Sequence, residues 1–566
     1  MYLAQFISLN ILVAFSIAAP QVDLNGTILE GRSFSLLNFP QEAFGNIPYA
    51  YAPRFSSSQP RSLNTLTFDA SQFGALCPQV NPAHVGISED CLTVNIVRPV
   101  LDNPAGPLPV MIWLFQGFFE EGQARNGSLV VLNSVLRDTP IIHVDMFYRV
   151  GPFGFPQGAE AAQRGALNLG LKDQIMGFEW IQSNIAAFGR DPKKVYFIAL
   201  CVNGLVKRYY VQVTLFGMDA GAISISLHYL NTNLANYAHA TIMQSGSQAS
   251  IALFGPELRQ PAWDTFANAT PECAGASPNS TFDCLRQANL STLLTSWEAA
   301  NASWGYDGSI PQMPFAPVID GENGVIPDLP FRLLAEGRFA HVPFIAGTVL
   351  DEGTNFTPRN VNFTDEAEVI KFIETEDQPY MPNPSAAYKA ALNSLLALYP
   401  DNPALGSPYG TGNNTFSLNP GFKRVAAIVG DLAFQALRRA WIQAATKAGV
   451  KTYGYLFTQA SAATPSQLFF GVQHESDIGY TYGDKVLTGA VPDIQLSFNV
   501  LDYWVSFATT LDPNDGFGLS SRIHWDPYDS DKPAVLQLSS NMTMIPDDYH
   551  KTQIDYINAN AAIFGH

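Results

Sequence analysis

The chain has 566 residues, of which 47% are apolar and 14% charged, a composition that argues against intrinsic disorder and allows one large α/β enzyme. Its 31 Lys and Arg residues against 49 Asp and Glu residues give a formal net charge of −18. Because such a surface repels phosphate backbones and anionic lipid, the charge argues against nucleic-acid binding and electrostatic attachment to membranes.

The N-terminus has the pattern of a secretory signal peptide. Residues 1–19 form an apolar run that ends in small side chains, so we expect them to be cleaved and the mature protein to be extracellular. No later segment has the ~18 consecutive apolar residues of a membrane-spanning helix, so no transmembrane segment is predicted. Acceptor sequons also fit a secreted glycoprotein, at Asn25, Asn126, Asn268, Asn279, Asn289, Asn301, Asn355, Asn362, Asn413 and Asn541.

The cysteines fit export as well. The chain has five, and Cys77 lies close to Cys91 in the sequence, as Cys273 does to Cys284. In a secreted chain such close pairs predict two disulfide bonds, which leaves Cys201 unpaired. Cysteines with the CxxC spacing of zinc ligands are absent from the sequence, so we expect no metal site and no cofactor.

The first half of the chain alternates strand-like and helix-like patterns. The run at 109–115 is continuously apolar and rich in β-branched and aromatic residues, which is typical of a strand buried on both faces of a sheet. Residues 167–188 place Leu171, Ile175 and Phe178 on one side of an amphipathic helix. Further strands are expected at 92–99, 140–149 and 213–217, and a further helix at 220–230.

The second half continues this alternation, with strands expected at 341–349 and 451–457 and helices at 426–448 and 503–510. The sequence has no internal repeat, long low-complexity linker or composition break. We therefore expect residues 20–566 to form a single domain of the α/β class. Its order of elements predicts an α/β-hydrolase fold, a mostly parallel central sheet flanked by helices.

Residues 195–212 fit this order poorly. They carry the odd Cys201 and separate "FGRDPKK" from the strand-like "VTLFG", and without them the loop would run straight into the strand. The segment is in frame, a valine codon can begin with GT, and a glutamine codon can end with AG, the bases at intron boundaries. We interpret it as a translated, unspliced intron; the alternative is a true extra hairpin at the mouth of the active site.

The stretch "TLFGMDAGAISI", residues 214–225, has the glycine spacing of the sharp strand-to-helix turn that carries a hydrolase nucleophile. Gly217 and Gly221 occupy the glycine positions. Asp219 lies between them, where a serine is expected. The turn therefore predicts a nucleophile position that holds a carboxylate.

Two later residues complete a candidate triad. In α/β hydrolases the nucleophile is followed along the chain by an acid and then by a histidine. Glu352 and His474 follow Asp219 in that order, and Asp351 is the competing acid beside Glu352.

Several motifs in the chain resemble those of a known protein family. Six stretches resemble, in the same order, the motifs of the type-B carboxylesterase, lipase and cholinesterase family, in particular its secreted fungal lipases and esterases. The resemblance covers nearly the whole mature chain and implies an α/β-hydrolase fold, Glu352 as the acid, His474 as the base and a hydrophobic ester as substrate. The stretches are "SEDCLTVNI" (88–96), "YRVGPFGF" (148–155), "NLGLKDQ" (168–174), "IMQSGS" (242–247), "DEGTNF" (351–356) and "DYWVSFATTLDPN" (502–514).

The oxyanion loop departs from the pattern of that family. Its three consecutive glycines appear here as "WLFQGFFEEG", with Gln116 and Phe118 in place of two of them. Because oxyanion donors are backbone amides, Gly117, Phe118 and Ala220 remain the expected donors. A Cβ at Phe118 restricts the backbone dihedrals, and the phenyl ring crowds the pocket.

Three functions follow from these residues. By resemblance the protein is a secreted carboxylic ester hydrolase. Because a carboxylate is a poor nucleophile toward an ester carbonyl, the first alternative is a catalytically inactive relative that binds a ligand or protein. The second alternative is a hydrolase in which Asp219 attacks an sp³ carbon, as an aspartate at this turn does in other α/β hydrolases that act on haloalkanes and epoxides.

Overall fold

The computed structural model describes residues 19–80, 86–101, 107–189, 212–230, 233–303, 313–377, 385–460, 464–519 and 521–565. The predicted signal peptide, apart from Ala19, lies outside these residues. So do Cys201 and the suspected insert at 195–212, apart from Gln212.

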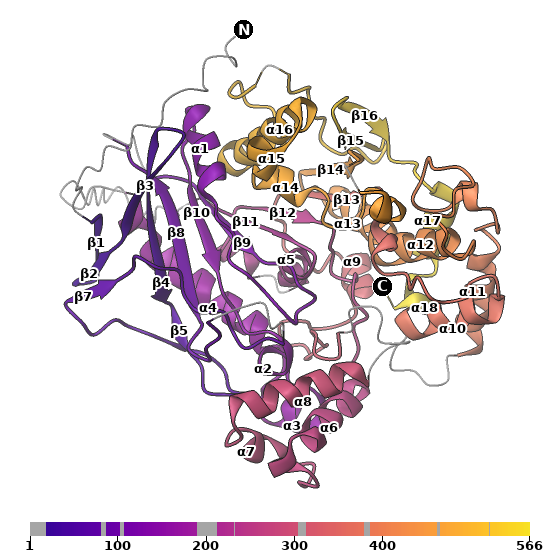
Figure 1. Cartoon of the computed structure of the whole chain (residues 1–566), viewed down its shortest axis with the longest axis horizontal. Helices are drawn as coiled ribbons and strands as arrows, with labels where there is room; N and C mark the ends of the chain where they lie inside the picture. The colour runs from indigo at the N-terminus through magenta and orange to yellow at the C-terminus, as the bar shows by residue number, and fades with distance from the viewer. Residues whose placement is uncertain are drawn as a thin grey trace.

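One large sheet forms the centre of the molecule (Figure 1). Neighbouring strands from β10 through β9, β11, β12, β13 and β14 to β15 are parallel, and the strands that flank them on both sides are antiparallel. Across the described residues the order is β16 (Thr543–Pro546), β15 (Ala534–Leu538), β14 (Thr452–Phe457), β13 (Phe344–Val349), β12 (Ala240–Gln244), β11 (Val213–Met218), β9 (Val110–Leu114), β10 (Ile142–Met146), β8 (Thr93–Pro99), β4 (Phe39–Pro48) and β3 (Arg32–Leu36).

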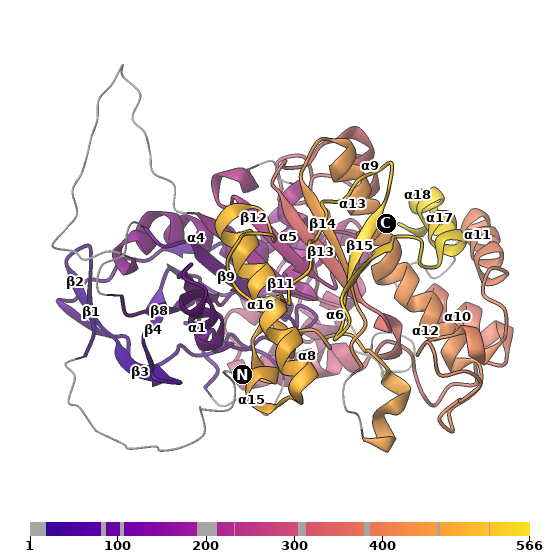
Figure 2. The same ribbon diagram turned by 90° about the horizontal axis from the view of Figure 1, so that it is seen from above.

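Helices cover both faces of this sheet (Figure 2). On one face α1 (Ser128–Leu136) packs against α16 (Val491–Thr510). On the other face lie α4 (Leu169–Asn184), α5 (Ala220–Leu230) and α13 (Ala436–Lys447), and α5 contacts β9, β11 and β12. Because both faces are covered, every residue of β9, β11 and β13 is buried, which explains why these strands are continuously apolar in sequence.

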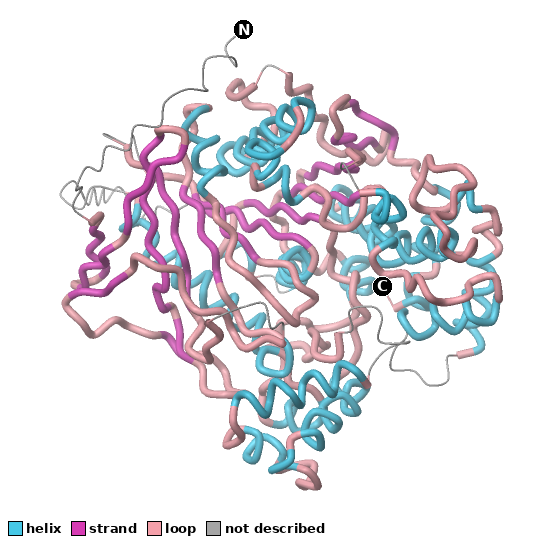
Figure 3. Tube along the Cα trace, in the orientation of Figure 1, coloured by secondary structure: helices cyan, strands magenta, loops and turns pink. Residues whose placement is uncertain are grey.

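The remaining elements surround the sheet (Figure 3). Two small sheets join β1 (Gln21–Leu24), β2 (Thr27–Glu30) and β7 (Thr67–Asp69), and β5 (Ala50–Tyr51) with β6 (Gln59–Pro60). The other helices are α2 (Gly151–Gly154), α3 (Gly158–Gln163), α6 (Gln260–Ala269), α7 (Thr281–Leu285), α8 (Leu290–Ala302), α9 (Pro330–Glu336), α10 (Glu366–Asp377), α11 (Ala386–Leu396), α12 (Phe422–Gly430), α14 (Ile478–Thr481), α15 (Asp484–Thr488), α17 (Lys551–Ala559) and α18 (Ala561–Phe564).

The predicted α/β-hydrolase fold is confirmed, and two predicted helices differ in extent. The helix expected at 503–510 is the last part of the longer α16. The helix expected at 426–448 is divided into α12 and α13 by a π-helical turn, Asp431–Gln435. No helix in the described ranges is both long and apolar enough to cross a membrane.

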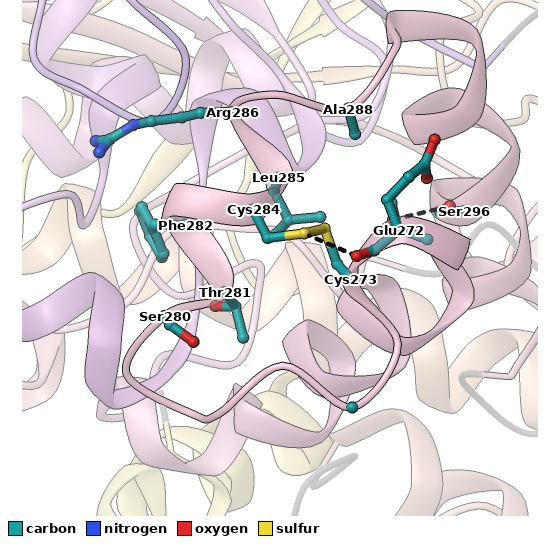
Figure 4. The surroundings of a disulfide bond; sticks show 12 residues. Glu272, Cys273, Ser280, Thr281, Phe282, Cys284, Leu285, Arg286, Ala288 and Ser296 are labelled. Carbon is teal, nitrogen blue, oxygen red and sulfur yellow. Dashed lines mark hydrogen bonds between the residues drawn. A yellow bond between two sulfur atoms is a disulfide. The ribbon is translucent and has the colours of Figure 1, made fainter.

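Both predicted disulfide bonds are present. One joins Cys77 to Cys91, and the other joins Cys273 to Cys284. The second ties the C-terminal end of α7 to the short helical turn Pro271–Cys273, which follows α6 (Figure 4). All the cysteines in the described part of the chain are therefore paired.

Candidate active site

Asp219 lies at the sharp turn between β11 and α5. β11 ends at Met218, α5 begins at Ala220, and Asp219 between them has a positive φ of 50°. Its backbone N–H donates to the carbonyl of Gln244, the last residue of the neighbouring strand β12, at 3.0 Å. The turn therefore holds the backbone of Asp219 in a left-handed conformation that directs its side chain away from the sheet.

The two glycines of this turn are required by close packing. A Cβ built on Gly221 would lie 2.0 Å from the carbonyl oxygen of Leu114 in β9. A Cβ on Gly217 would lie 2.8 Å from the carbonyl carbon of Gly221. Any larger residue at either position would push backbone segments apart, so the glycine spacing that marks the turn in the sequence has a steric cause.

The carboxylate of Asp219 accepts hydrogen bonds from two of the backbone amides that were predicted to bind an oxyanion. The N–H groups of Gly117 and Phe118 both donate to Oδ2 of Asp219, each at 3.1 Å. The loop reaches this position with φ values of 121° at Gly117 and 57° at Phe118, so the phenylalanine adopts the left-handed conformation despite its Cβ. Of the predicted donors, Ala220 begins α5 directly beside Asp219.

His474 is paired with the predicted acid. Its Nδ1 lies 2.6 Å from Oε2 of Glu352, and the other carboxylate oxygen of Glu352 accepts the backbone N–H of Val349 at 2.8 Å. The competing acid Asp351 has other partners, because its oxygens accept from the Ser407 hydroxyl and the Val472 backbone. Geometry therefore favours Glu352 over Asp351 as the partner of His474.

On its other side, His474 faces Asp219. The Nε2 atom of His474 lies 3.7 Å from Oδ1 of Asp219, an ion-pair distance that is longer than a hydrogen bond. Glu352, His474 and Asp219 are each at most 3% exposed. The structure thus brings the three predicted triad residues together in one buried row.

The charges in this row favour a protonated histidine. Burial alone would lower the pKa of His474, but the carboxylates of Glu352 and Asp219 outweigh burial and raise that pKa well above its usual value. Burial alone would raise the pKa of Asp219, but contact with His474 and the two loop amides outweighs it and lowers that pKa. The two carboxylates therefore favour the imidazolium form of His474.

Aromatic rings surround the imidazole. Phe356 and Phe434 pack on His474 with ring centroids 5.1 Å and 4.9 Å away, and Phe118 packs edge-on against Phe356. Sequence reasoning missed Phe356 and Phe434 as parts of the site. Phe356 ends the "DEGTNF" motif only a few residues after Glu352, so that motif was its available signal.

A cavity of about 350 Å³ lies over His474, Gly117 and Phe118, three residues that also contact Asp219. Its lining contains two carboxyl side chains, those of Glu121 and Glu475, and neither Lys nor Arg. Sequence reasoning also missed Glu475, which follows His474 with a φ of 72° and whose pKa is raised by burial. The other lining residues are Gln116, Gly122, Gln123, Asn355, Phe356, Phe470 and Gln473.

The loop that carries His474 is fixed from below. Asp477 is buried, and its Oδ2 accepts hydrogen bonds from the Tyr455 hydroxyl at 2.7 Å and from Nε2 of Gln244 at 3.0 Å. Gln244 also accepts the backbone N–H of Asp219, so one residue at the end of β12 ties both sides of the row together. Such support limits the movement of Asp219 relative to His474.

Comparison with known proteins shows the family of the chain. The model of the carboxylesterase family matches residues 18–199 and 211–557. The chain is 31% identical to Lipase 2 of Geotrichum candidum over 97% of this chain and 96% of the relative. It is 33% identical to Secreted lipase 1 of Botryotinia fuckeliana, over 97% of this chain and 94% of that relative. It is 31% identical to Lipase 4 of Diutina rugosa, over the full length of both chains. The matches cover nearly the whole chain, and the chain has the α/β-hydrolase fold. This chain therefore belongs to the carboxylesterase family.

Proposed function

We propose that the protein is an extracellular hydrolase of hydrophobic carboxylic esters, with Glu352 and His474 as acid and base and Asp219 at the position of the nucleophile. The observation that carries this proposal is the 2.6 Å contact between His474 Nδ1 and Glu352 Oε2 beside the cavity. The lipase names of the relatives support an ester substrate, and the word "secreted" in one of them supports export. Phenyl rings in the cavity lining suit an apolar acyl chain.

Asp219 makes this hydrolase slow. Attack of its carboxylate on an ester carbonyl would give a reactive anhydride. Its Oδ2 also accepts the N–H groups of Gly117 and Phe118, which an oxyanion would need. The nucleophile of this reaction is then a water molecule that His474 activates. Because two carboxylates keep His474 protonated, ester hydrolysis is expected to be weak at neutral pH and to rise as the pH increases.

The test is a comparison of Asp219→Ser with the natural chain on p-nitrophenyl esters of medium-length fatty acids. Serine supplies a hydroxyl that His474 can activate. It also frees the N–H groups of Gly117 and Phe118 to bind the developing oxyanion, and it removes one of the two carboxylates beside His474. We expect kcat to rise by at least about 100-fold. His474→Ala in the Asp219→Ser background should remove this gain.

The outcomes separate the candidate functions. Weak activity in the natural chain that disappears in His474→Ala supports slow hydrolysis. No activity in the natural chain together with strong activity in Asp219→Ser would show that the pocket only binds esters as the chain stands. A folded Asp219→Ser variant without esterase activity would refute an ester site in this cavity.

A further inference from the structure

Side-chain amides gather in the lining of the cavity over His474. Six of the lining side chains are amides or carboxyl groups, and none of the lining residues is Lys or Arg. The amides are those of Gln116, Gln123, Asn355 and Gln473, and the carboxyl groups are those of Glu121 and Glu475. Because a side-chain amide both donates and accepts hydrogen bonds, most of the polar groups at this cavity can do both.

Two of these amides have an oxygen that is buried without a partner. Among the described residues, no group donates a hydrogen bond to Oε1 of Gln116 or to Oδ1 of Asn355. Gln116 is only 8% exposed, so its side chain has little contact with solvent outside the cavity. Since a buried amide oxygen without a partner is unfavourable, this lining suits a ligand that donates hydrogen bonds to both oxygens.

Hydroxyl groups match this lining better than ions do. An ammonium group donates hydrogen bonds but accepts none, so it would leave the N–H groups of the amides without a partner. An anion accepts but donates none, so it would leave the oxygens of Gln116 and Asn355 unpaired and would meet two carboxyl groups. A hydroxyl both donates and accepts, and it carries no charge.

The number of polar side chains favours several hydroxyls on one molecule. Glycerol with one acyl group keeps two free hydroxyls, whereas a hexose with one acyl group keeps four. Six polar side chains in the lining match the hexose better. The volume of about 350 Å³ is near the lower end of the range for small-molecule pockets, which favours one sugar ring over a longer saccharide.

The same cavity offers apolar surface beside the base. Phe118 packs edge-on against Phe356, and Phe356 packs on the imidazole of His474. Phe470 adds a third phenyl ring to the lining. An acyl chain that contacts these rings leaves the amides and carboxyl groups for the alcohol part of an ester.

We propose that this cavity binds the sugar part of a fatty-acid ester of a sugar, with the amides of Gln116 and Asn355 as hydrogen-bond partners of the sugar hydroxyls. The proposal names the alcohol part of the ester, and for the reaction it rests on the proposed function. Binding of the sugar does not require that reaction.

In the reaction, the oxygen of water forms a bond to the acyl carbon, and neutral His474 takes a proton from that water. The bond from the acyl carbon to the sugar oxygen breaks, and the sugar oxygen keeps the electron pair. His474 then gives its proton to the sugar oxygen. The sum is sugar ester plus water to fatty acid plus free sugar.

Four amphiphiles with the same octyl chain test the proposal by binding alone. They are octyl glucoside, octyl glyceryl ether, octyltrimethylammonium and nonanoate, and none of them contains an ester bond. We would measure the dissociation constant of each with the full-length natural chain by isothermal titration calorimetry, below the concentrations at which the probes form micelles. Octyl glucoside should bind at least about tenfold more tightly than each of the others, because it supplies the most hydroxyls to the polar lining.

Two variants locate the sugar. Gln116→Met and Asn355→Leu each remove an amide and keep a side chain of similar size, and each should weaken binding of octyl glucoside by at least about fivefold. Binding of octyltrimethylammonium should change less. Circular dichroism confirms that each variant is folded.

Two further variants are controls. Gln287→Met changes an exposed glutamine outside the lining, and it should leave the binding of all four probes unchanged. Thr357→Val removes the same glycosylation sequon as Asn355→Leu but keeps the amide of Asn355, so it should bind octyl glucoside as the natural chain does. Equal losses in Thr357→Val and Asn355→Leu would contradict the role of the Asn355 amide.

Equal binding of octyl glucoside and octyl glyceryl ether would overturn the proposal, as would tighter binding of the ammonium or of nonanoate. Failure of the folded natural chain to bind any of the four would also overturn it. Assays of Asp219→Ser with p-nitrophenyl octanoate and glucose octanoate report separately on the proposed function. Sugar binding without hydrolysis of either ester would refute the esterase alone, and hydrolysis without preference for octyl glucoside would refute the sugar site alone.

Discussion

The Nε2 atom of His474 lies 3.7 Å from Oδ1 of Asp219, so the imidazole has a carboxylate on each side. A hydrolase triad with a serine has one carboxylate, which orients a neutral histidine until the nucleophile gives up its proton. Here Glu352 and then Asp219 raise the pKa of His474, so the pair of carboxylates favours the imidazolium. The first predictions therefore concern the protonation of His474 between Glu352 and Asp219.

The first prediction concerns the titration of His474. In the natural chain its pKa should lie well above neutral, and Asp219→Asn should lower it, because one of the two carboxylates is lost while the shape of the side chain is kept. Nitrogen-15 NMR of labelled histidine measures both values. Equal pKa values in the two proteins would contradict the ion pair between Asp219 and His474.

The second prediction is the dependence of stability on pH. The pKa of His474 is raised in the folded protein, so its contribution to stability is complete below the unfolded value of about 6.5 and is lost as the pH rises through the folded pKa. Thermal unfolding temperatures of the natural chain should therefore fall in alkaline buffer. The fall should be smaller in Asp219→Asn.

Asp219 contributes in the opposite direction. Its pKa is lowered in the folded protein, so its contribution is present above the unfolded value of about 3.9 and is lost as the pH falls through the folded pKa. The advantage of the natural chain over Asp219→Asn should therefore disappear in acid as well as in strong alkali. A constant difference across the whole pH range would argue against both contributions.

The third prediction separates the two neighbouring acids. Glu352→Gln should lower the pKa of His474 and reduce stability by about 3 kcal/mol, because it leaves a buried imidazolium with one carboxylate fewer. Asp351→Asn is the matched control, since Asp351 is equally buried but binds Ser407 and Val472 instead. Asp351→Asn should destabilise the fold without changing the titration of His474.

The turn at Asp219 was predictable because its signal is local. Gly217 and Gly221 are spaced by the steric needs of one strand and one helix, and the buried strands are read from their own apolar residues. The contact of Asp219 with the amides of Gly117 and Phe118 was not predictable. It joins segments about a hundred residues apart through a loop whose dihedrals no local pattern defines.

The π-helical turn between α12 and α13 shows the same limit. The apolar periodicity of 426–448 predicts one helix, but Gln435 in the turn donates to the carbonyl of Val349 and accepts from the Thr348 hydroxyl. These contacts hold the end of β13 next to Glu352. The extra backbone residue per turn serves tertiary hydrogen bonds that the periodicity of a single helix does not contain.

The fourth prediction tests the packing of the turn. Gly221→Ala would place a methyl group 2.0 Å from the carbonyl oxygen of Leu114, so strand and helix have to separate. We expect the free energy of unfolding to fall by about 3 kcal/mol and the carboxylate of Asp219 to leave the loop amides. Gly516→Ala is the control, because a Cβ there meets no atom within 4 Å. Equal stabilities in urea titrations would contradict the packing argument.

The last prediction concerns residues 195–212. We propose that they are the product of an unspliced intron, and two observations support this. The match to the carboxylesterase family leaves out residues 200–210, which lie within the segment, and removal of Cys201 would leave only cysteines that form disulfides. A chain without 195–212 should be secreted, and its free energy of unfolding should lie within about 1 kcal/mol of that of the full-length protein, because the length of a connecting segment changes stability little. Transcripts sequenced from the source should include a form that lacks these codons. If every transcript retains them and the shortened chain fails to fold, the segment is a true part of the protein.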